Sequence, residues 1–271
     1  MDLTLLAGLR QTMYEAAKDG AFALAYSGGL DSRFLAHAAK LSGLKPLLLH
    51  VTGPHVPPEE TRFARTWAEK NALPFREVPV NPLNLPPVAA GSRERCYACK
   101  KELFTRLLAE SSLPLCDGTN ASDASAYRPG IRAVRELGVI SPLALAGLGK
   151  KEIHFLAEQT GMEQPMQKAR PCLLTRLPYG ATPTEAILAA VAAGEEAARA
   201  ALARHNMENV DLRLRLVAPD RVELHLIASD METMSVPFRE KLVQCVHAAM
   251  PGYPRPVLSA QESLSGFFDR T

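Results

Sequence analysis

A short apolar run that ends in a glycine turn constrains the fold of this chain more than any other feature. Residues 22–26 form the apolar run, Ser27-Gly28-Gly29 follow, and beyond Asp31 the apolar residues recur at helical spacing. The pattern predicts a strand, a tight turn and a helix. This arrangement brings backbone N–H groups and a helix N-terminus to one point, where they can bind phosphate. The two glycines lack a Cβ atom, so the backbone can close around an anion.

The residues of the turn indicate which phosphate chemistry to expect. Ser27 and Ser32 add hydroxyl donors, whereas the carboxylate of Asp31 repels phosphate and is better suited to hold Mg²⁺ beside it. No lysine follows the glycines, which excludes the P-loop pattern. The segment 27–32 instead matches SGGxDS, the motif of the PP-loop pyrophosphatases; the alternative is an ordinary glycine-rich β–α turn. The motif implies cleavage of ATP between its α and β phosphates, with adenylation of a substrate oxygen and release of pyrophosphate.

Strand and helix patterns alternate through the first two-thirds of the chain. Strand patterns cover residues 46–51, 75–80 and 113–118, and helix patterns cover 59–71 and 95–111. The alternation predicts an α/β fold, in which a parallel doubly wound sheet is covered by helices on both faces. Ligands of such sheets bind at the carboxyl ends of the strands. We therefore expect the SGGxDS turn and the polar residues Gly118, Thr119 and Asn120 to share one nucleotide pocket.

The pattern changes near residue 177. A helix pattern over 182–205, two alternating segments over 210–216 and 221–226, and a helix pattern over 235–249 follow one another. We predict a PP-loop ATP pyrophosphatase domain over 1–176 and a smaller α+β domain over 177–271 that binds substrate or forms oligomer contacts. The last twenty residues, which contain Pro, Gly and Ser, are expected to form a loosely docked tail.

Composition argues against several classes of protein. The net charge is only +2 among 271 residues and no long basic run is present, which argues against a large nucleic-acid surface. No apolar run approaches the roughly 20 residues of a membrane span, and the N-terminal segment does not resemble a signal peptide. The five cysteines are an odd number, which favours thiols or metal ligands over a disulfide framework. We expect a cytoplasmic homo-oligomer that acts on a small-molecule nucleotide, with neither a membrane nor a nucleic acid as partner.

Three of the five cysteines lie in sequence patterns that are compatible with metal binding, dithiol exchange or nucleophilic attack. Cys96 and Cys99 are three residues apart at the start of a predicted helix, where they could bind iron–sulfur or zinc, exchange as a dithiol, or only pack. Cys172 lies among basic residues, and positive charge favours the nucleophilic thiolate. These basic residues are Lys168, Arg170 and Arg176.

Six elements occur in order along the chain. They are SGGLDS at 27–32, RCYACK at 95–100, DGTN at 117–120 with YRPG at 127–130, SPL at 141–143 with KKEI at 150–153, CLLTRLPYG at 172–180, and the arginine pair Arg213 and Arg215. Over roughly residues 15–230, these elements resemble the LarE family of ATP-dependent sulfur transferases. The resemblance implies ATP and Mg²⁺ as cofactors. It also implies that the enzyme adenylates a carboxylate of pyridinium-3,5-biscarboxylic acid mononucleotide and inserts sulfur, in the synthesis of the nickel-pincer nucleotide.

The resemblance also assigns roles to residues. Cys172 occupies the sulfur-bearing position, and Arg213 and Arg215 occupy positions that hold the substrate phosphate. Their spacing puts the two arginines on one face of a strand. Arg176, which we also expect to be catalytic, and Glu195 are expected to line the same cavity. The alternative for these two residues and for the arginine pair is a role in structural salt bridges. The sequence departs from the family pattern at Met166-Gln167, Leu174-Thr175 and Ala121-Ser122-Asp123. These departures bear on the choice of substrate and on the source of sulfur.

Two sources of sulfur stay open. In one branch of the family the cysteine at the position of Cys172 gives up its own sulfur and becomes dehydroalanine. In the other, three cysteines hold a [4Fe-4S] cluster whose open iron carries an extra sulfide, and Cys96, Cys99 and Cys172 would be those ligands. The basic residues beside Cys172 favour the first route.

Two other enzyme classes use related chemistry. A PP-loop tRNA thiolase would need a basic surface that follows the RNA phosphates, and binding of bulk tRNA at several salt concentrations would reveal it. An ammonia-dependent amide ligase would need no cysteine, so retained activity of a Cys172→Ala variant would indicate it. The SGGxDS residues are all present, which argues against a nucleotide sensor with a degenerate loop.

Overall fold

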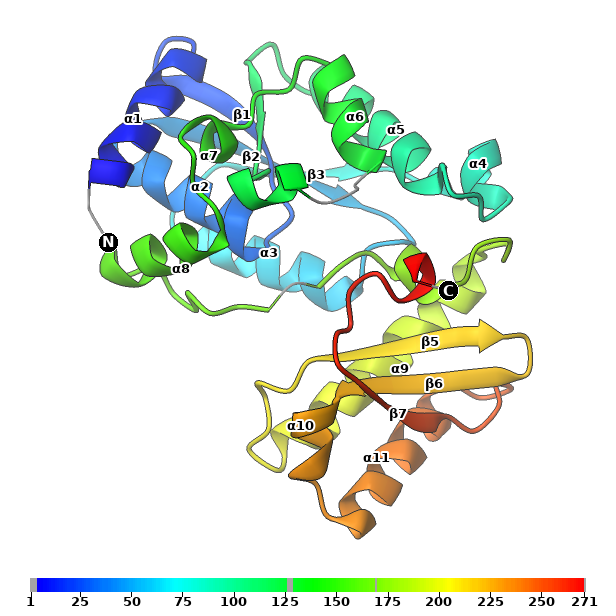
Figure 1. Cartoon of the computed structure of the whole chain (residues 1–271). Coiled ribbons are helices and arrows are strands. Elements are labelled where there is room, and N and C mark those ends of the chain that lie inside the picture. The colour runs from blue at the N-terminus through cyan, green and yellow to red at the C-terminus, as the bar shows by residue number, and fades with distance from the viewer. Residues whose placement is uncertain (1–3, 126–128, 169, 271) are drawn as a thin grey trace. The chain divides into compact units, whose positions relative to one another are not determined.

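The computed structural model describes residues 4–125, 129–168 and 170–270 (Figure 1). Tyr127 and Arg128 of the YRPG motif lie outside these ranges. The chain divides into two compact units. The first consists of Met1–Leu85 and Glu94–Arg170, and the second of Pro86–Arg93 and Pro171–Thr271. The division of ATP binding and substrate binding between two domains stays a prediction.

The first unit is built on a four-stranded parallel sheet. Its strands are β1 (Ala21–Ala25), β2 (Lys45–Thr52), β3 (Phe75–Pro79) and β4 (Leu115–Asp117). They lie in the order β3-β2-β1-β4, so the strand order reverses between β1 and β4. Each strand overlaps a predicted strand pattern, although β4 is shorter than its pattern, and the predicted α/β fold is confirmed. Ligands of open parallel sheets bind outside the carboxyl ends of the strands at such a point of reversal.

Helices cover both faces of this sheet. They are α1 (Thr4–Ala16), α2 (Leu30–Leu41), α3 (Pro58–Lys70), α5 (Arg95–Ala109), α6 (Pro129–Glu136), α7 (Pro142–Leu145) and α8 (Lys150–Gln159). Phe22 and Leu24 of β1 pack with α1, α2, α3 and α8, whereas Ala23 packs on the opposite face with α5 and α6. The alternation of side chains along a strand therefore builds two apolar cores. No helix in the described ranges has the length and apolar character of a membrane crossing.

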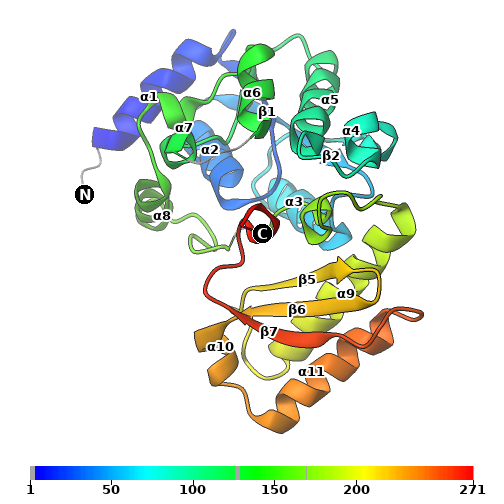
Figure 2. The ribbon, with the colours of Figure 1, turned by 45° about the vertical axis from the view of Figure 1, so that its right-hand side comes forward.

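The second unit combines a small mixed sheet with helices. β5 (Leu212–Ala218) and β6 (Arg221–Ile227) form the predicted antiparallel hairpin, and β7 (Val257–Gln261) lies parallel to β6. The helices are α4 (Pro86–Ala89), α9 (Glu185–Ala203), α10 (Ala228–Glu232) and α11 (Val236–Ala249). α9 and α11 pack against each other and against the sheet (Figure 2). Gly194 allows the close approach of α9 to β5, because a Cβ atom there would lie 2.3 Å from Cδ2 of Leu214.

The prediction of a loosely docked C-terminal tail is wrong. β7 pairs with β6 along its whole length. Beyond β7, Leu264 is 5% exposed, and the ring of Phe267 lies 4.5 Å from that of His225, centroid to centroid. The local pattern of this segment is too short to indicate a strand. The strand forms because the edge of β6 supplies the backbone hydrogen-bond partners.

Candidate functional site

The candidate phosphate site is the turn between β1 and α2. Gly28 has a φ of +78°, and a Cβ atom on it would lie 2.9 Å from Cβ of Ala64. Glycine is the residue that fits this position without strain. The Gly29 N–H donates to Ser27 Oγ at 3.2 Å, and Ser32 Oγ donates to the Gly29 carbonyl at 3.1 Å. The two serines thus hold the turn at the N-terminus of α2, where the first N–H groups of a helix have no carbonyl partner within it.

The polar segment after β4 lies against this turn. A Cβ atom on Gly118 would lie 2.9 Å from the backbone nitrogen of Ser32. Asp117 holds the segment in place, because its carboxylate accepts from Ser141 Oγ at 2.6 Å and from the Thr119 N–H at 3.1 Å. The two predicted loops therefore meet where the strand order reverses. Their role in nucleotide binding stays a prediction.

The carboxylate of Asp31 forms an ion pair that the sequence does not indicate. Lys150 Nζ lies 2.7 and 2.5 Å from its two oxygens, and Asn120 Nδ2 donates to Oδ2 at 3.3 Å. Lys150 is the first residue of α8, and its backbone N–H donates to Ser122 Oγ at 3.1 Å. Lys150 belongs to the KKEI segment that resembles the LarE family, but this segment assigns it no function. A lysine at a helix start is too common to be a signal by itself.

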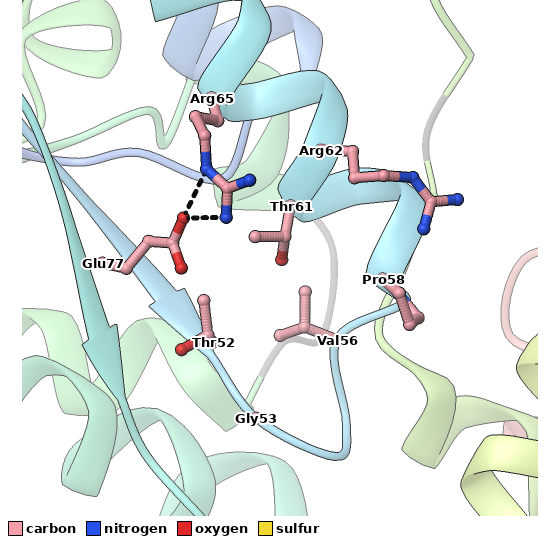
Figure 3. A pocket seen from close by; sticks show the side chains of 8 residues that line it. All are labelled: Thr52, Gly53, Val56, Pro58, Thr61, Arg62, Arg65 and Glu77. Carbon is pink, nitrogen blue, oxygen red and sulfur yellow. Dashed lines mark hydrogen bonds and ion pairs between the residues drawn. The ribbon is translucent and has the colours of Figure 1, made fainter.

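A cavity of about 350 Å³ lies at the carboxyl end of β2 (Figure 3). Because β1 and β2 are parallel neighbours, this is also the edge of the sheet at which the turn follows β1. Among its lining residues, Thr52 ends β2, Gly53 follows it, and Thr61 and Arg65 come from α3. Arg65 donates from Nε and Nη2 to Glu77 Oε1 at 2.9 and 2.5 Å. Ala64, which packs against Gly28, is also on α3. The helix α3 therefore contacts both the turn and the cavity.

The cysteines of the predicted cluster belong to different units. Cys96 and Cys99 lie on the first turn of α5 in the first unit, with Cys99 buried and Cys96 half-buried. Cys172 lies in the second unit, where its carbonyl accepts from Thr175 Oγ1 at 2.8 Å. Among the described residues, no three His, Cys, Asp or Glu side chains lie together as a metal-binding group. The convergence of all three cysteines therefore stays a prediction.

Two of the basic residues near Cys172 in the sequence bind carboxylates. Arg170 Nη1 lies 2.6 Å from Glu60 Oε1. Arg176 is 1% exposed and donates from Nε and Nη2 to Glu195 at 2.7 and 3.1 Å. The positive charge expected around Cys172 is therefore balanced in part, which weakens one reason to favour a free thiolate there.

Glu195 is the centre of a buried network in the second unit. Besides the two bonds from Arg176, its oxygens accept from the Leu214 N–H at 3.0 Å and from Arg199 Nη2 at 3.2 Å. Burial raises the pKa of Glu195, but Arg176, Arg199 and these hydrogen bonds outweigh burial and lower it. Glu195 is thus held as a carboxylate by neighbours within the fold, and its predicted contact with substrate stays a prediction.

The paired arginines lie beside this network on β5, each 3% exposed. Arg213 Nη1 donates to Asp211 Oδ1 at 2.5 Å, and Arg215 Nη2 donates to the Leu264 carbonyl at 2.5 Å. Burial, followed by the nearby charge of Arg176, lowers the pKa of both arginines, to about 10 for Arg215. A buried site crowded with guanidinium groups favours the arrival of an anion.

No protein-family model matches the chain. Curated relatives include the uncharacterized protein slr1717 of Synechocystis sp., 35% identical over 162 residues, which are 58% of this chain and 60% of the relative. The uncharacterized protein MJ0830 of Methanocaldococcus jannaschii is 32% identical over 184 residues, which are 65% of this chain and 69% of the relative. The pyridinium-3,5-bisthiocarboxylic acid mononucleotide synthase of Lactiplantibacillus plantarum is 28% identical over 201 residues, 72% and 73% of the two chains. The match to the Synechocystis protein spans less than two thirds of that relative.

Proposed function

This chain belongs to the family of the uncharacterized protein MJ0830, and we propose that it is an ATP-dependent sulfur transferase of the LarE type that acts on a pyridinium mononucleotide. The turn between β1 and α2 is the observation that carries the proposal, because Gly28 and Gly118 pack too closely for side chains and leave the N-terminus of α2 at the point where the strand order reverses. The acceptor is taken from the name of the Lactiplantibacillus relative, whose product is a sulfur-bearing pyridinium mononucleotide. A cytoplasmic location and a homo-oligomer stay predictions from sequence.

In this proposal, ATP binds along the carboxyl edge of the first sheet. The backbone at Gly28 and Gly29, with Ser27 and Ser32, would hold the pyrophosphate, and the cavity at the end of β2 offers room for the adenosine. The side chain of Asp31 is 21% exposed, so Mg²⁺ could reach it together with phosphate oxygens and water. Bound Mg²⁺ would neutralise phosphate charge and favour departure of pyrophosphate. Lys150 is then free to turn from Asp31 toward a phosphate.

We expect Lys150→Gln to raise the KM for ATP by about tenfold, because one charge-assisted contact to phosphate is lost. Lys151→Gln is the matched variant, since Lys151 is the exposed next residue on the same helix turn. Pyrophosphate release measured over a range of ATP concentrations gives the comparison. Equal KM values for the two variants would remove Lys150 from the ATP site.

In the proposed reaction, sulfur moves from Cys172 to the acceptor in three steps. A carboxylate oxygen of the acceptor attacks the α-phosphorus of ATP, and pyrophosphate leaves. The Cys172 thiolate attacks the acyl carbon and displaces AMP, which forms a thioester. A base then removes the α-proton of Cys172, the Cβ–S bond breaks, and the sulfur stays on the acceptor as a thiocarboxylate while dehydroalanine is left in the chain. In the other route, Cys172 would be a cluster ligand with Cys96 and Cys99 and would not be consumed.

Cys172→Ala should abolish thiocarboxylate formation and leave ATP-dependent pyrophosphate release in place, because adenylation does not use the thiol. Cys245→Ala, a half-buried cysteine on α11, is the matched variant and should form product like the wild type. The assay incubates each protein with ATP, Mg²⁺ and pyridinium-3,5-biscarboxylic acid mononucleotide and records product and intact protein mass. Product formation by Cys172→Ala would contradict the proposal.

The same assay separates the two sources of sulfur. Loss of the mass of H₂S from the wild-type chain would identify Cys172 as the donor. Unchanged mass, with visible absorbance after anaerobic iron reconstitution that Cys96→Ala and Cys99→Ala remove, would identify the cluster route.

A further inference from the structure

Arg215 is held on three sides by residues of its own unit. Its Nη1 lies 2.7 Å from His225 Nδ1, its Nη2 donates to the Leu264 carbonyl at 2.5 Å, and its guanidinium carbon lies 4.9 Å from the centroid of Phe267. The Nε–H is buried and has no hydrogen-bond partner among the described residues. A guanidinium has five N–H donors, so these contacts orient the group and still leave donors for an anion.

His225 is itself fixed by a carboxylate. Arg215 can only donate, so Nδ1 of His225 must accept and the ring proton must be on Nε2. That nitrogen lies 2.8 Å from Glu223 Oε2, and it therefore donates to Glu223. The ring of His225 is fully buried, which leaves it no water as an alternative partner. Glu223, His225 and Arg215 thus form one directed chain of hydrogen bonds across the β5–β6 hairpin.

The protonation state agrees with this direction. Burial, and next the charge of Arg215, lowers the pKa of His225 to about 4. The imidazole is therefore neutral near pH 7 and can accept the hydrogen bond from Arg215. A protonated ring would have no acceptor to offer and would repel the guanidinium.

We propose that His225, oriented by Glu223, is a positioning residue that sets the Arg215 guanidinium for the phosphate of the acceptor. The inference rests on the proposed function, in which Arg215 binds that phosphate. The Nε–H edge of Arg215 is the part of the group that this arrangement keeps for the anion. His225 makes no contact with substrate in this scheme and acts through the orientation of Arg215.

The test compares binding of pyridinium-3,5-biscarboxylic acid mononucleotide with binding of the nucleoside that lacks the phosphate, by titration calorimetry at pH 7.5 with the full chain. The Kd of the nucleoside divided by the Kd of the nucleotide measures recognition of the phosphate alone. We expect His225→Leu to reduce this ratio by about tenfold or more, because the bond that orients a charged donor is lost. His225→Asn, whose side-chain oxygen can replace Nδ1 as acceptor, should keep most of the ratio. His247→Asn, at an exposed histidine of α11, is the matched variant and should keep all of it.

The outcomes distinguish the proposed phosphate site at Arg215 from the proposed positioning role of His225. Equal binding of nucleotide and nucleoside by the wild type would contradict the proposed phosphate site itself. A wild-type preference that Arg215→Lys loses and a folded His225→Leu retains would overturn the role of His225 alone. Equal losses in His225→Asn and His225→Leu would also overturn it, because they would indicate a packing role. If His225→Leu does not fold, as judged by circular dichroism, Glu223→Gln provides the comparison. It keeps an oxygen that can accept from Nε2 and is expected to retain the ratio, and loss of the ratio in this variant would contradict the scheme.

Discussion

Replacement of Asp31 by asparagine is expected to lower ATP-dependent pyrophosphate release by about 10²- to 10³-fold, which corresponds to several kcal/mol of stabilisation by a bound cation. The change keeps the size of the side chain and removes the charge that would hold Mg²⁺ beside the phosphates. It also ends the ion pair with Lys150. Both side chains of that pair are partly exposed, so the expected loss of folding stability is at most about 1 kcal/mol. The measurement is pyrophosphate release over a range of Mg²⁺ concentrations.

Asp19→Asn is the matched variant for this experiment. Asp19 is exposed and has a φ of +51°, a conformation that asparagine adopts readily. The Asp19→Asn variant should therefore release pyrophosphate at the wild-type rate. If Asp31→Asn releases pyrophosphate at the wild-type rate with the same Mg²⁺ dependence, the role of Asp31 in the proposed ATP site is wrong.

The second large effect concerns stability. Glu195→Ala should lower the free energy of unfolding of the second unit by about 3–5 kcal/mol, because it leaves the buried Arg176 guanidinium without its carboxylate. The charge of Arg176 already helps to lower the pKa of the nearby Arg213. Without Glu195, the charge of Arg176 would be uncompensated and would repel Arg213 more strongly. Urea unfolding followed by circular dichroism is the suitable measurement, since the single tryptophan, Trp67, lies in the first unit.

Glu196→Ala is the matched variant, because Glu196 is the exposed next residue on α9. This variant should change the free energy of unfolding by no more than about 0.5 kcal/mol.

The contribution of Glu195 to the free energy of unfolding should also depend on pH. Its pKa is lower in the folded chain than the ordinary 4.5, so the contribution is complete above pH 4.5 and is lost as pH falls through the folded-state value. The difference between wild type and Glu195→Ala should therefore shrink in acid. A difference below 1 kcal/mol at pH 7 would mean that the network does not hold this unit together.

Local patterns predicted most of the secondary structure, because their causes act over a few residues. The strand from Ala21 to Ala25 and the helix from Leu30 follow from apolar spacing, and the turn between them follows from two adjacent glycines. β7 escaped prediction because a short edge strand depends on the neighbour with which it pairs. The meeting of the turn with Gly118 was expected from the general rule that ligands of parallel sheets bind at the carboxyl ends of the strands. The order of the strands was not predicted, and only the folded structure shows it.

The α/β class and the glycine turn after β1 could be predicted from local sequence patterns, and so could the candidate residues for binding and catalysis. The ion pairs and hydrogen bonds that these residues make could be identified only in the folded structure. Lys150 meets Asp31 across 119 positions, Glu195 binds Arg176 across 19, and the Leu264 carbonyl reaches Arg215 across 49. No local pattern encodes such pairs, because they form when packed elements bring buried charges and donors within reach of the partners that burial requires.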